Sequence, residues 1–552
     1  MALWIKNADI LTMDRRRPRA QSAVVAEGAF AFVGTAAETE EFLRRHPQPE
    51  LQQLDCAGQQ LLPGFNDSHM HWLHYVKARM GADLRSCRSL KAVLEEMARF
   101  LREEFDPQSG LWLVGEGWNQ DFFTDEKRFP TREDLDGISR EIPIFIMRTC
   151  YHIGTLNTPA LAALGLTEQT AEWGDFLERD GQGRLTGVVK EALLDAIKSR
   201  IPTPDERELA RRMAREQVRL FEKGVTSVQS DDFLYAPRPY ELMEELLRLS
   251  RQGTLQLRIG EQAVLPAWED MDRFFDQERL DGGFGDRRVK YTCIKLLADG
   301  SLGARTAYLL RPYADAPETC GLPIYRQEEL TRLVCRAHGH NMAVAIHAIG
   351  DGAVQMCQNA IRQARETMPW YRPRHGIVHC QITEQAQVRA FRELELIAYV
   401  QPVFLDYDIH IVKERVGQAL ADTSYAFRDY MEEGVCTAFG TDCPVESFDP
   451  MRGIYCAVTR RDLQGRGPYR PEQAVTRRQA LYAYTAAGAY ASRDEAWKGR
   501  IAPGFVADFI TVDHDLLTCP AREILQTRVT RTFIDGKPVW DRDKNKTEGD
   551  AL

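Results

Sequence analysis

Eight short β-rich apolar runs alternate with helical patterns along most of this 552-residue chain. Such alternation is typical of βα units that build a parallel sheet. The runs cover residues 60–69, 224–230, 255–264, 289–299, 342–349, 375–381, 396–405 and 436–445. Eight strands in this order predict an α/β fold, a (β/α)8 TIM-like barrel, whose functional residues lie at the C-terminal ends of the strands.

The gap between the first run and the second is too long for a single crossover connection. It contains two further β-rich pieces, "LWLVGEGWN" at 111–119 and "IPIFIMRTC" at 142–150. We therefore expect the barrel to comprise residues 59–74 and 201–499. Residues 75–200 are expected to form an inserted subdomain that covers the barrel mouth.

Both ends of the chain lie outside the barrel pattern. Residues 1–58 have the pattern of short strands and turns, and "TRTFIDGKPVW" at 530–540 has that of a hairpin with Asp535-Gly536 at its turn. The termini of a domain often lie close together. Residues 1–58 and 500–545 are therefore predicted to form one small β-sandwich domain.

Composition and charge argue against several classes of protein. The formal net charge is −10 and the pI is about 5.8, which disfavours a nucleic-acid or anionic-membrane partner. No apolar stretch approaches the ~18 residues of a membrane helix, and Lys6 and Asp9 interrupt any N-terminal signal sequence. The 12 cysteines form no C-x-x-C pair. We expect a cytoplasmic protein that acts on a small molecule and, as the commonest soluble oligomer, forms a homodimer.

The first run ends in two histidines one residue apart, in "LLPGFNDSHMHW" at 61–72. Alternate side chains of a strand share a face, so His69 and His71 point one way and Met70 points the other. Two imidazoles on one face can hold one metal ion. They can also be ordinary polar residues where a strand runs out into solvent, so the pair alone leaves both interpretations open.

Other runs carry polar residues near the same end, namely Lys295, His347, His379 and Asp442. In a barrel these side chains converge with the two histidines of the first run. Imidazole and carboxylate suit zinc and similar divalent ions, so the set predicts a binuclear metal site. A neutral lysine that takes up carbon dioxide becomes a carbamate, which can bridge two metals. The alternative for Lys295 is a salt bridge to a neighbouring acid such as Asp299.

Several motifs together strongly resemble the metal-dependent amidohydrolase superfamily: "PGFNDSHMH", "IKLLADGSLGARTAYL", "IHAIGDGAV", "GIVHCQ" and "FGTDCPV". The chain looks like the amidohydrolase 3, or YtcJ-like, branch, which includes N-substituted formamide deformylases. The resemblance covers nearly the whole chain and implies a TIM-like barrel with a β-sandwich. It implies two zinc ions, one held by His69, His71 and Asp442 and the other by the remaining two histidines. These are His347 and His379, with carbamylated Lys295 as the bridge.

This ligand set suits hydrolysis of an amide. A water between two cations has its pKa lowered from 15.7 toward about 7, which makes hydroxide available. Asp442 is placed to take the nucleophile's proton and pass it to the leaving amine, while one metal stabilises the oxyanion. We expect a hydrolase of an N-acyl or N-formyl amide.

Two alternatives remain beside amide hydrolysis. The first is deamination of a heterocycle on the same scaffold, which the position of Lys295 disfavours because deaminases of the superfamily typically use one metal. The second is a non-catalytic binding or regulatory descendant, which would usually have lost metal ligands.

Three further residues are candidate substrate contacts. The segments "GEGWNQDFF" and "MRTCYHIGTLN" resemble the family's tryptophan-rich and histidine stretches, which makes Trp118 and His152 candidates. Family members often have an acid after that tryptophan, whereas this chain has Asn119. Arg305, just beyond Lys295, is a candidate for binding a substrate carboxylate. A structural role, or for Arg305 a surface salt bridge, is the alternative in each case.

Overall fold

The computed structural model describes residues 2–150 and 152–544. The chain forms two compact units. The larger comprises the residues up to Trp72 together with those from Ala210 onward, and the smaller comprises Leu73–Leu209. No helix among the described residues is long and apolar enough to cross a bilayer.

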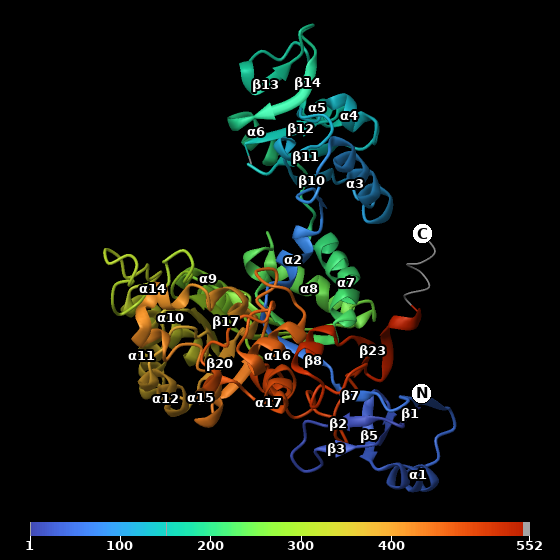
Figure 1. The fold of residues 1–552 in the computed structure, drawn as a ribbon, viewed down its shortest axis with the longest axis vertical. Coiled ribbons are helices and arrows are strands. Elements are labelled where there is room, and N and C mark those ends of the chain that lie inside the picture. The colour runs from blue at the N-terminus through green and yellow to red at the C-terminus, as the bar shows by residue number, and fades with distance from the viewer. Residues whose placement is uncertain (1, 151, 545–552) are drawn as a thin grey trace. The chain divides into compact units, whose positions relative to one another are not determined.

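The larger unit contains an eight-stranded sheet whose neighbouring strands are all parallel (Figure 1). In sheet order the strands are β8 (Phe65–Met70), β15 (Val225–Ser230), β16 (Arg258–Val264), β17 (Val289–Leu297), β18 (Val344–Ala348), β19 (Gly376–His379), β20 (Ile397–Val400) and β21 (Cys436–Phe439). Each strand overlaps one of the eight predicted runs. The prediction of a TIM-like parallel barrel is confirmed.

The first and last barrel strands meet just beyond their carboxyl ends. There the backbone N–H of Asp442 donates to the carbonyl of His69 at 2.9 Å, and that of His71 donates to the carbonyl of Cys443 at 2.7 Å. These bonds make the barrel nearly closed. They also bring His69 and His71 beside Asp442 and Cys443, which lie far away along the chain.

Helices alternate with the barrel strands. The principal ones are α7 (Glu206–Glu222), α8 (Pro239–Arg251), α10 (Gln327–Gly339), α11 (Asp351–Thr367), α12 (Gln385–Glu393), α14 (Val412–Ala421), α15 (Phe427–Glu432), α16 (Pro450–Thr459) and α17 (Arg477–Tyr482). On α10 the buried apolar residues are Leu330, Leu333, Val334 and Ala337, a spacing that places them on one face. Each such stripe packs its helix inward and leaves the polar face to solvent.

Two more sheets use both ends of the chain. One has the order β5 (Ala29–Gly34), β4 (Ser22–Ala26), β1 (Ala2–Lys6), β6 (Leu51–Asp55). The other has the order β24 (Lys537–Asp541), β23 (Val529–Ile534), β22 (Phe509–Val512), β7 (Gln60–Pro63), β2 (Asp9–Leu11), β3 (Arg19–Ala20). Residues from both sheets share one apolar cluster, which includes Ile5, Phe30 and Phe509. The predicted limits at residues 1 and 545 lie outside the described residues.

The predicted hairpin near the C-terminus is present. Strands β23 and β24 pair antiparallel with Ile534 opposite Lys537, and both turn residues have positive φ, 50° at Asp535 and 71° at Gly536. An Asp-Gly pair suits this left-handed turn because glycine and, less readily, aspartate adopt positive φ.

The first predicted run needs a correction, because residues 60–69 are not one barrel strand. Residues 60–63 form β7, which pairs with β2 and β22 in the terminal sheet, and the barrel begins with β8 at Phe65. Gly64 lies at the crossing, where a Cβ would come within 2.2 Å of Thr226 Oγ1. The chain changes sheets here, and a continuous apolar run does not reveal a change of pairing partner.

The smaller unit has its own six-stranded sheet, coloured blue to green in Figure 1. Its order is β13 (Leu177–Arg179), β14 (Leu185–Lys190), β12 (Ile153–Leu156), β11 (Ile144–Arg148), β10 (Leu113–Trp118), β9 (Ala82–Asp83). Helix α3 (Leu90–Glu103) contributes to one apolar cluster of this unit, and α5 (Thr158–Leu164) and α6 (Glu191–Lys198) contribute to another. These two clusters give the insertion a core of its own.

Candidate metal centre

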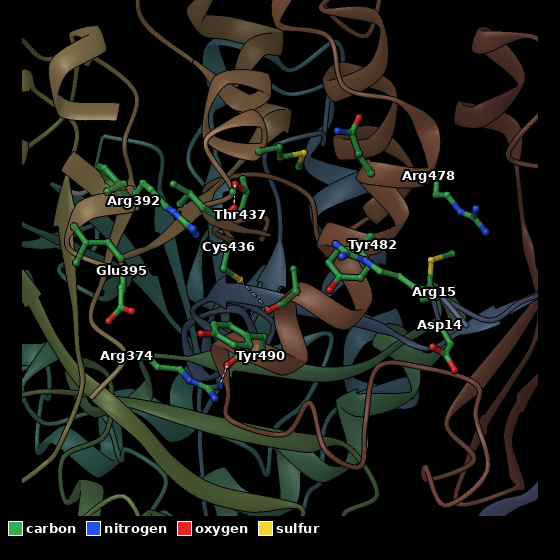
Figure 2. A pocket seen from close by; sticks show the side chains of 18 of the residues that line it. Asp14, Arg15, Arg374, Arg392, Glu395, Cys436, Thr437, Arg478, Tyr482 and Tyr490 are labelled. Atoms are coloured by element: carbon green, nitrogen blue, oxygen red, sulfur yellow. Dashed lines mark hydrogen bonds between the residues drawn. The ribbon is translucent and has the colours of Figure 1, made fainter. Parts of the chain in front are cut away.

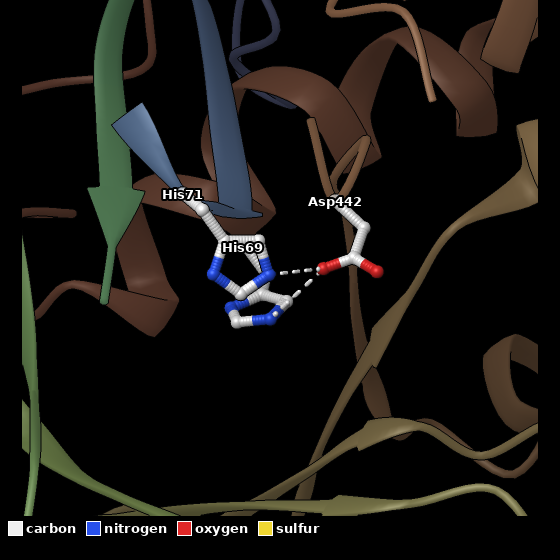
Figure 3. Close-up of side chains that lie close together, drawn as sticks. All are labelled: His69, His71 and Asp442. Carbon is white, nitrogen blue, oxygen red and sulfur yellow. Dashed lines mark hydrogen bonds and ion pairs between the residues drawn. The ribbon is translucent and has the colours of Figure 1, made fainter. Parts of the chain in front are cut away.

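Three predicted ligands converge at the carboxyl ends of the barrel strands (Figure 3). His69 lies near the end of β8, His71 follows that strand, and Asp442 follows β21. The Oδ1 atom of Asp442 lies 3.3 Å from Nε2 of His69 and 2.9 Å from Nε2 of His71. One ligand atom from each residue lies within 4.8 Å of the other two, a spacing compatible with a single ion.

Buried side chains fix which ring nitrogen of each histidine faces the centre. Gln262 Oε1 lies 2.7 Å from Nδ1 of His69, and the Gln262 amide nitrogen donates to the carbonyl of Ser68 at 3.2 Å. The Gln262 oxygen is therefore an acceptor, which keeps the His69 proton on Nδ1 and leaves a lone pair on Nε2. That Nε2 is buried and has no hydrogen-bond partner among the described residues. A buried imidazole nitrogen of this kind suits a metal ion.

His71 is oriented by a carboxylate in the same way. Its Nδ1 contacts Asp231 Oδ1, and Asp231 follows β15. Burial alone would lower the pKa of His71, but the negative charges of Asp231 and then Asp442 outweigh it and raise the pKa to about 10. Burial would likewise raise the pKa of Asp442, yet the two histidines that face its carboxylate hold it well below its usual range. The metal-free site therefore holds an imidazolium against an ionised carboxylate.

The backbone around these ligands is held by a second buried acid, Asp67. Its Oδ1 accepts the backbone N–H groups of His69 and Thr441, both at 3.1 Å. Asp442 has φ of +60° and His379 has φ of +77°, values that side-chain-bearing residues rarely adopt. Strained backbone of this kind concentrates where surrounding structure fixes a functional side chain.

Lys295 lies on β17 with only 2% of its surface exposed. Its Nζ is 3.6 Å from Asp231 Oδ2, so the neighbouring acid is Asp231 rather than Asp299. The Asp299 carboxylate instead accepts the backbone N–H groups of Tyr308, Ile349 and Gly350, at 2.8 to 3.0 Å. Asp231 thus contacts both His71 and Lys295, a link that the sequence did not predict.

The other two predicted ligands form a second pair. The rings of His347 and His379 lie with centroids 4.4 Å apart, and the His379 ring is 5.8 Å from that of His69. Nδ1 of His379 contacts Gln401 Oε1 at 2.9 Å, while Nε2 of His347 lies 3.0 Å from the carbonyl of Gly300. Burial, followed by the neighbouring His347 ring, lowers the pKa of His379 well below its usual value, so this imidazole is neutral.

The three candidate substrate contacts differ in their surroundings. Trp118 is fully buried in the core of the insertion, edge-on to Phe129 at 5.8 Å. His152 has a side chain 67% exposed, with Nδ1 at 3.0 Å from Glu191. Arg305 makes a two-pronged ion pair with Asp315 at 2.7 and 3.1 Å. The contacts of Trp118 and Arg305 are the structural roles that the sequence allowed, and a substrate role for all three stays a prediction.

Three orienting residues were not predicted: Asp231, Gln262 and Gln401. Asp231 and Gln401 directly follow β15 and β20, which is the position that singled out the ligands themselves. Gln262 lies within β16 and carries no such signal, since a buried glutamine is ordinarily a structural residue. The ligands were predicted as polar residues near the ends of strands. The same search, extended to amides and further acids, would have found Asp231 and Gln401.

Comparison with known proteins places the chain in a family. Residues 52–540 match the model of the amidohydrolase family. The chain is 28% identical to YtcJ of Bacillus subtilis (strain 168), which carries the name of an amidohydrolase, over 98% of this chain and 99% of that one. It is 27% identical to the N-substituted formamide deformylase of Arthrobacter pascens, over 98% of each chain. A metal-dependent hydrolase from Pyrococcus horikoshii OT3 superposes with a TM-score of 0.71 at 27% identity, over 94% of this chain and 99% of that structure.

Proposed function

The chain belongs to the amidohydrolase family, and we propose that it cleaves the C–N bond of an N-acyl or N-formyl amide with the help of divalent metal. Family membership makes it a hydrolase that acts on carbon–nitrogen bonds. The observation that carries the metal proposal is the convergence of His69 Nε2 and His71 Nε2 on Asp442 Oδ1, at 3.3 and 2.9 Å. The similarity to a formamide deformylase supports the N-formyl class of substrate.

The ligand chemistry supports zinc as the ion. Neutral imidazole and carboxylate are ligands that zinc prefers. His69, His71 and Asp442 would hold one ion, and His347 and His379 a second. Divalent ions in these places would supply a water of lowered pKa and would polarise the scissile carbonyl.

Asp442 is proposed to move the proton. Its carboxylate accepts a proton from the attacking water and delivers it to the leaving nitrogen. The C–O bond forms and the C–N bond breaks, so one amide and one water give a carboxylic acid and an amine. Gln262 and Asp231 hold the rings of His69 and His71 through Nδ1 while this happens.

Lys295 is proposed to bridge two ions as a carbamate. The burial of Lys295 beside the predicted ligands supports this role, because a group that bridges two ions has to lie inside the site. The ion pair with Asp231, at 3.6 Å, favours the competing state in which Lys295 remains an ammonium and the site holds one ion. If Lys295 is carbamylated, bicarbonate accelerates reactivation of the metal-stripped enzyme. Reactivation that is indifferent to bicarbonate would count against the bridge.

The single-ion state is the basis of the second candidate function, deamination of a heterocycle. The two candidate functions differ in their product, because amide hydrolysis releases an amine and deamination releases ammonia. We expect metal-loaded enzyme to release benzylamine from N-benzylformamide or N-benzylacetamide, and Asp442→Asn to lose at least about a hundredfold in kcat. The matched control is Asp429→Asn, an acid of α15 outside the site. Ammonia from a panel of amino-substituted heterocycles, with no amine from either amide, would favour the deaminase.

Three further features of the protein are proposals. The shared apolar cluster supports a β-sandwich formed by the two terminal sheets. All 12 cysteines are unpaired, which supports a cytoplasmic compartment. A homodimer is proposed because twofold assemblies are the commonest among soluble oligomers. Light scattering of the metal-loaded protein tests the last of these.

A further inference from the structure

A pocket of about 860 Å³ lies at the end of the barrel opposite the candidate metal centre. Figure 2 shows side chains that line it. Val435 and Cys436 line it where β21 begins, and Leu396 lines it just before β20. The ligands His379 and Asp442 lie at or beyond the other ends of their strands. None of the six predicted metal ligands lines this pocket. It is a site distinct from the one proposed for catalysis.

The lining of the pocket is strongly basic. It contains six arginines, namely Arg15, Arg365, Arg372, Arg374, Arg392 and Arg478. The lining also contains two acids, Asp14 and Glu395. The chain as a whole carries a formal net charge of −10, so this excess of positive charge is local.

Most of these arginines have no acidic partner among the described residues. Arg365 pairs with Glu395 at 3.0 Å, and Arg374 pairs with Glu495 at 2.6 Å. Within residues 2–150 and 152–544, no ion pair includes the other four, although Arg478 donates to the carbonyl of Pro18 at 3.2 Å. Guanidinium groups gathered around one cavity repel each other and raise its positive potential. An anion bound among them would relieve that repulsion and accept charge-assisted hydrogen bonds.

The same pocket also has apolar and aromatic walls. Tyr490 stacks under the Arg374 guanidinium, with 3.9 Å from the charged carbon to the ring centroid. Tyr482, Leu396 and Val435 contribute further apolar surface. Figure 2 shows Arg374, Arg392 and Arg15 reaching the pocket from different segments of the chain. The volume lies within the ~300–1,000 Å³ that small-molecule sites occupy.

We propose that this pocket binds a small organic anion, in which a carboxylate or phosphate is joined to an aromatic or aliphatic body. The anionic group lies against Arg372 and Arg392, and the apolar body lies against Tyr482 and Leu396. This site is independent of the proposed amide hydrolysis, because it shares no residue with the metal ligands.

Calorimetric titration of the metal-loaded protein with 1-naphthyl phosphate tests the proposal. Two half-probes each supply one part of the proposed ligand: neutral 1-naphthol has only the apolar body, and inorganic phosphate has only the anionic group. A further probe, 1-naphthoate, replaces the phosphate by a carboxylate. We expect 1-naphthyl phosphate or 1-naphthoate to bind saturably at one equivalent, and both half-probes to bind more weakly. Arg372→Gln and Arg392→Gln should each weaken binding about tenfold, because each removes a charged hydrogen-bond donor.

Arg389→Gln is the matched control, since Arg389 is an exposed arginine of α12, the helix that also carries Arg392, and does not line the pocket. It should bind the probes as the unaltered protein does. Three outcomes would overturn the proposal. They are no saturable binding of either anionic probe, equal binding by both pocket variants and the unaltered protein, or an equal loss in Arg389→Gln. Equal binding by the pocket variants would place the anion elsewhere, for example on the metal.

Discussion

The Oδ1 atom of Asp442 lies 2.9 Å from Nε2 of His71, although 371 residues separate the two along the chain. The contact spans the seam where the first and last barrel strands meet. Backbone bonds between His69 and Asp442 and between His71 and Cys443 hold the seam, so barrel closure and assembly of the candidate site are the same event. A change that opens this seam is expected to weaken metal binding.

Gln262→Leu should weaken metal binding without removing a ligand. The variant loses the acceptor that lies 2.7 Å from His69 Nδ1 and holds the ring in place. Loss of such an orienting hydrogen bond typically costs roughly 10- to 100-fold in metal affinity. Competition with a chromogenic chelator measures it. The control is Gln358→Leu, a buried glutamine of α11 that donates to the carbonyl of Gln387 at 2.9 Å, and it should leave the affinity unchanged. Equal affinities for all three proteins would contradict the orienting role.

Metal binding should release a proton from His71. The nearby carboxylates raise the pKa of His71 to about 10 despite its burial, so at pH 7.5 the metal-free site carries that proton. A metal that binds Nε2 must displace it, and affinity should therefore rise with pH up to about 10. Calorimetry in buffers of different ionisation enthalpy counts the released protons.

Asp231→Asn should reduce that proton release by about one per site, because it removes the charge that raises the pKa of His71. The matched control is Asp513→Asn, which alters an exposed histidine–aspartate pair, His514 with Asp513 at 2.9 Å. It should leave the release unchanged. Undiminished release by Asp231→Asn would show that another group supplies the proton.

Asp408→Asn should stabilise the protein above about pH 6. Burial raises the pKa of Asp408 to about 6, even though the Tyr425 hydroxyl donates to its carboxylate at 2.7 Å. The folded state therefore holds the proton more tightly than the unfolded chain does, and stability declines as pH rises from about 4 through about 6. The amide removes this penalty and keeps an oxygen for Tyr425.

The gain from Asp408→Asn should be absent near pH 4 and reach about 2–3 kcal/mol in the free energy of unfolding above pH 6. Urea denaturation at several pH values measures it, with exposed Asp422→Asn as the control. A gain that does not vary with pH would mean that Asp408 is not the titrating group.

Arg258→Met should destabilise the larger unit severely. Arg258 begins β16 in the barrel and is 3% exposed. It bonds Asp508, the residue just before β22, at 2.6 and 3.0 Å. Its removal leaves the Asp508 carboxylate buried without its cation, at a cost of about 3–5 kcal/mol. The double variant Arg258→Met/Asp508→Leu should recover most of this loss. Chemical denaturation that finds a loss below about 1 kcal/mol for the single variant would contradict the account.

The sequence predicted much of the barrel because each of its strands is an apolar run between helices. Polar residues at the ends of those runs predicted which side chains would meet, and His69, His71 and Asp442 do meet. The pairing partners of strands were beyond such reasoning. Residues 60–63 and 65–70 look continuous in sequence but belong to different sheets. The sequence also could not predict hydrogen bonds between distant strands. The contact of Gln262 with His69, for example, joins residues 193 positions apart along the chain.

Metal content per chain tests the central claim most directly. Elemental analysis gives the number of metal ions per chain. It is applied to the unaltered protein and to His347→Ala, both purified without chelators or a histidine tag. The account predicts about two equivalents of zinc or a similar ion in the unaltered protein and about one in the variant, which keeps His69, His71 and Asp442. One equivalent in both would refute the bridged pair of ions. No metal in the unaltered protein, and none bound after zinc is added, would contradict a metal-dependent hydrolase altogether.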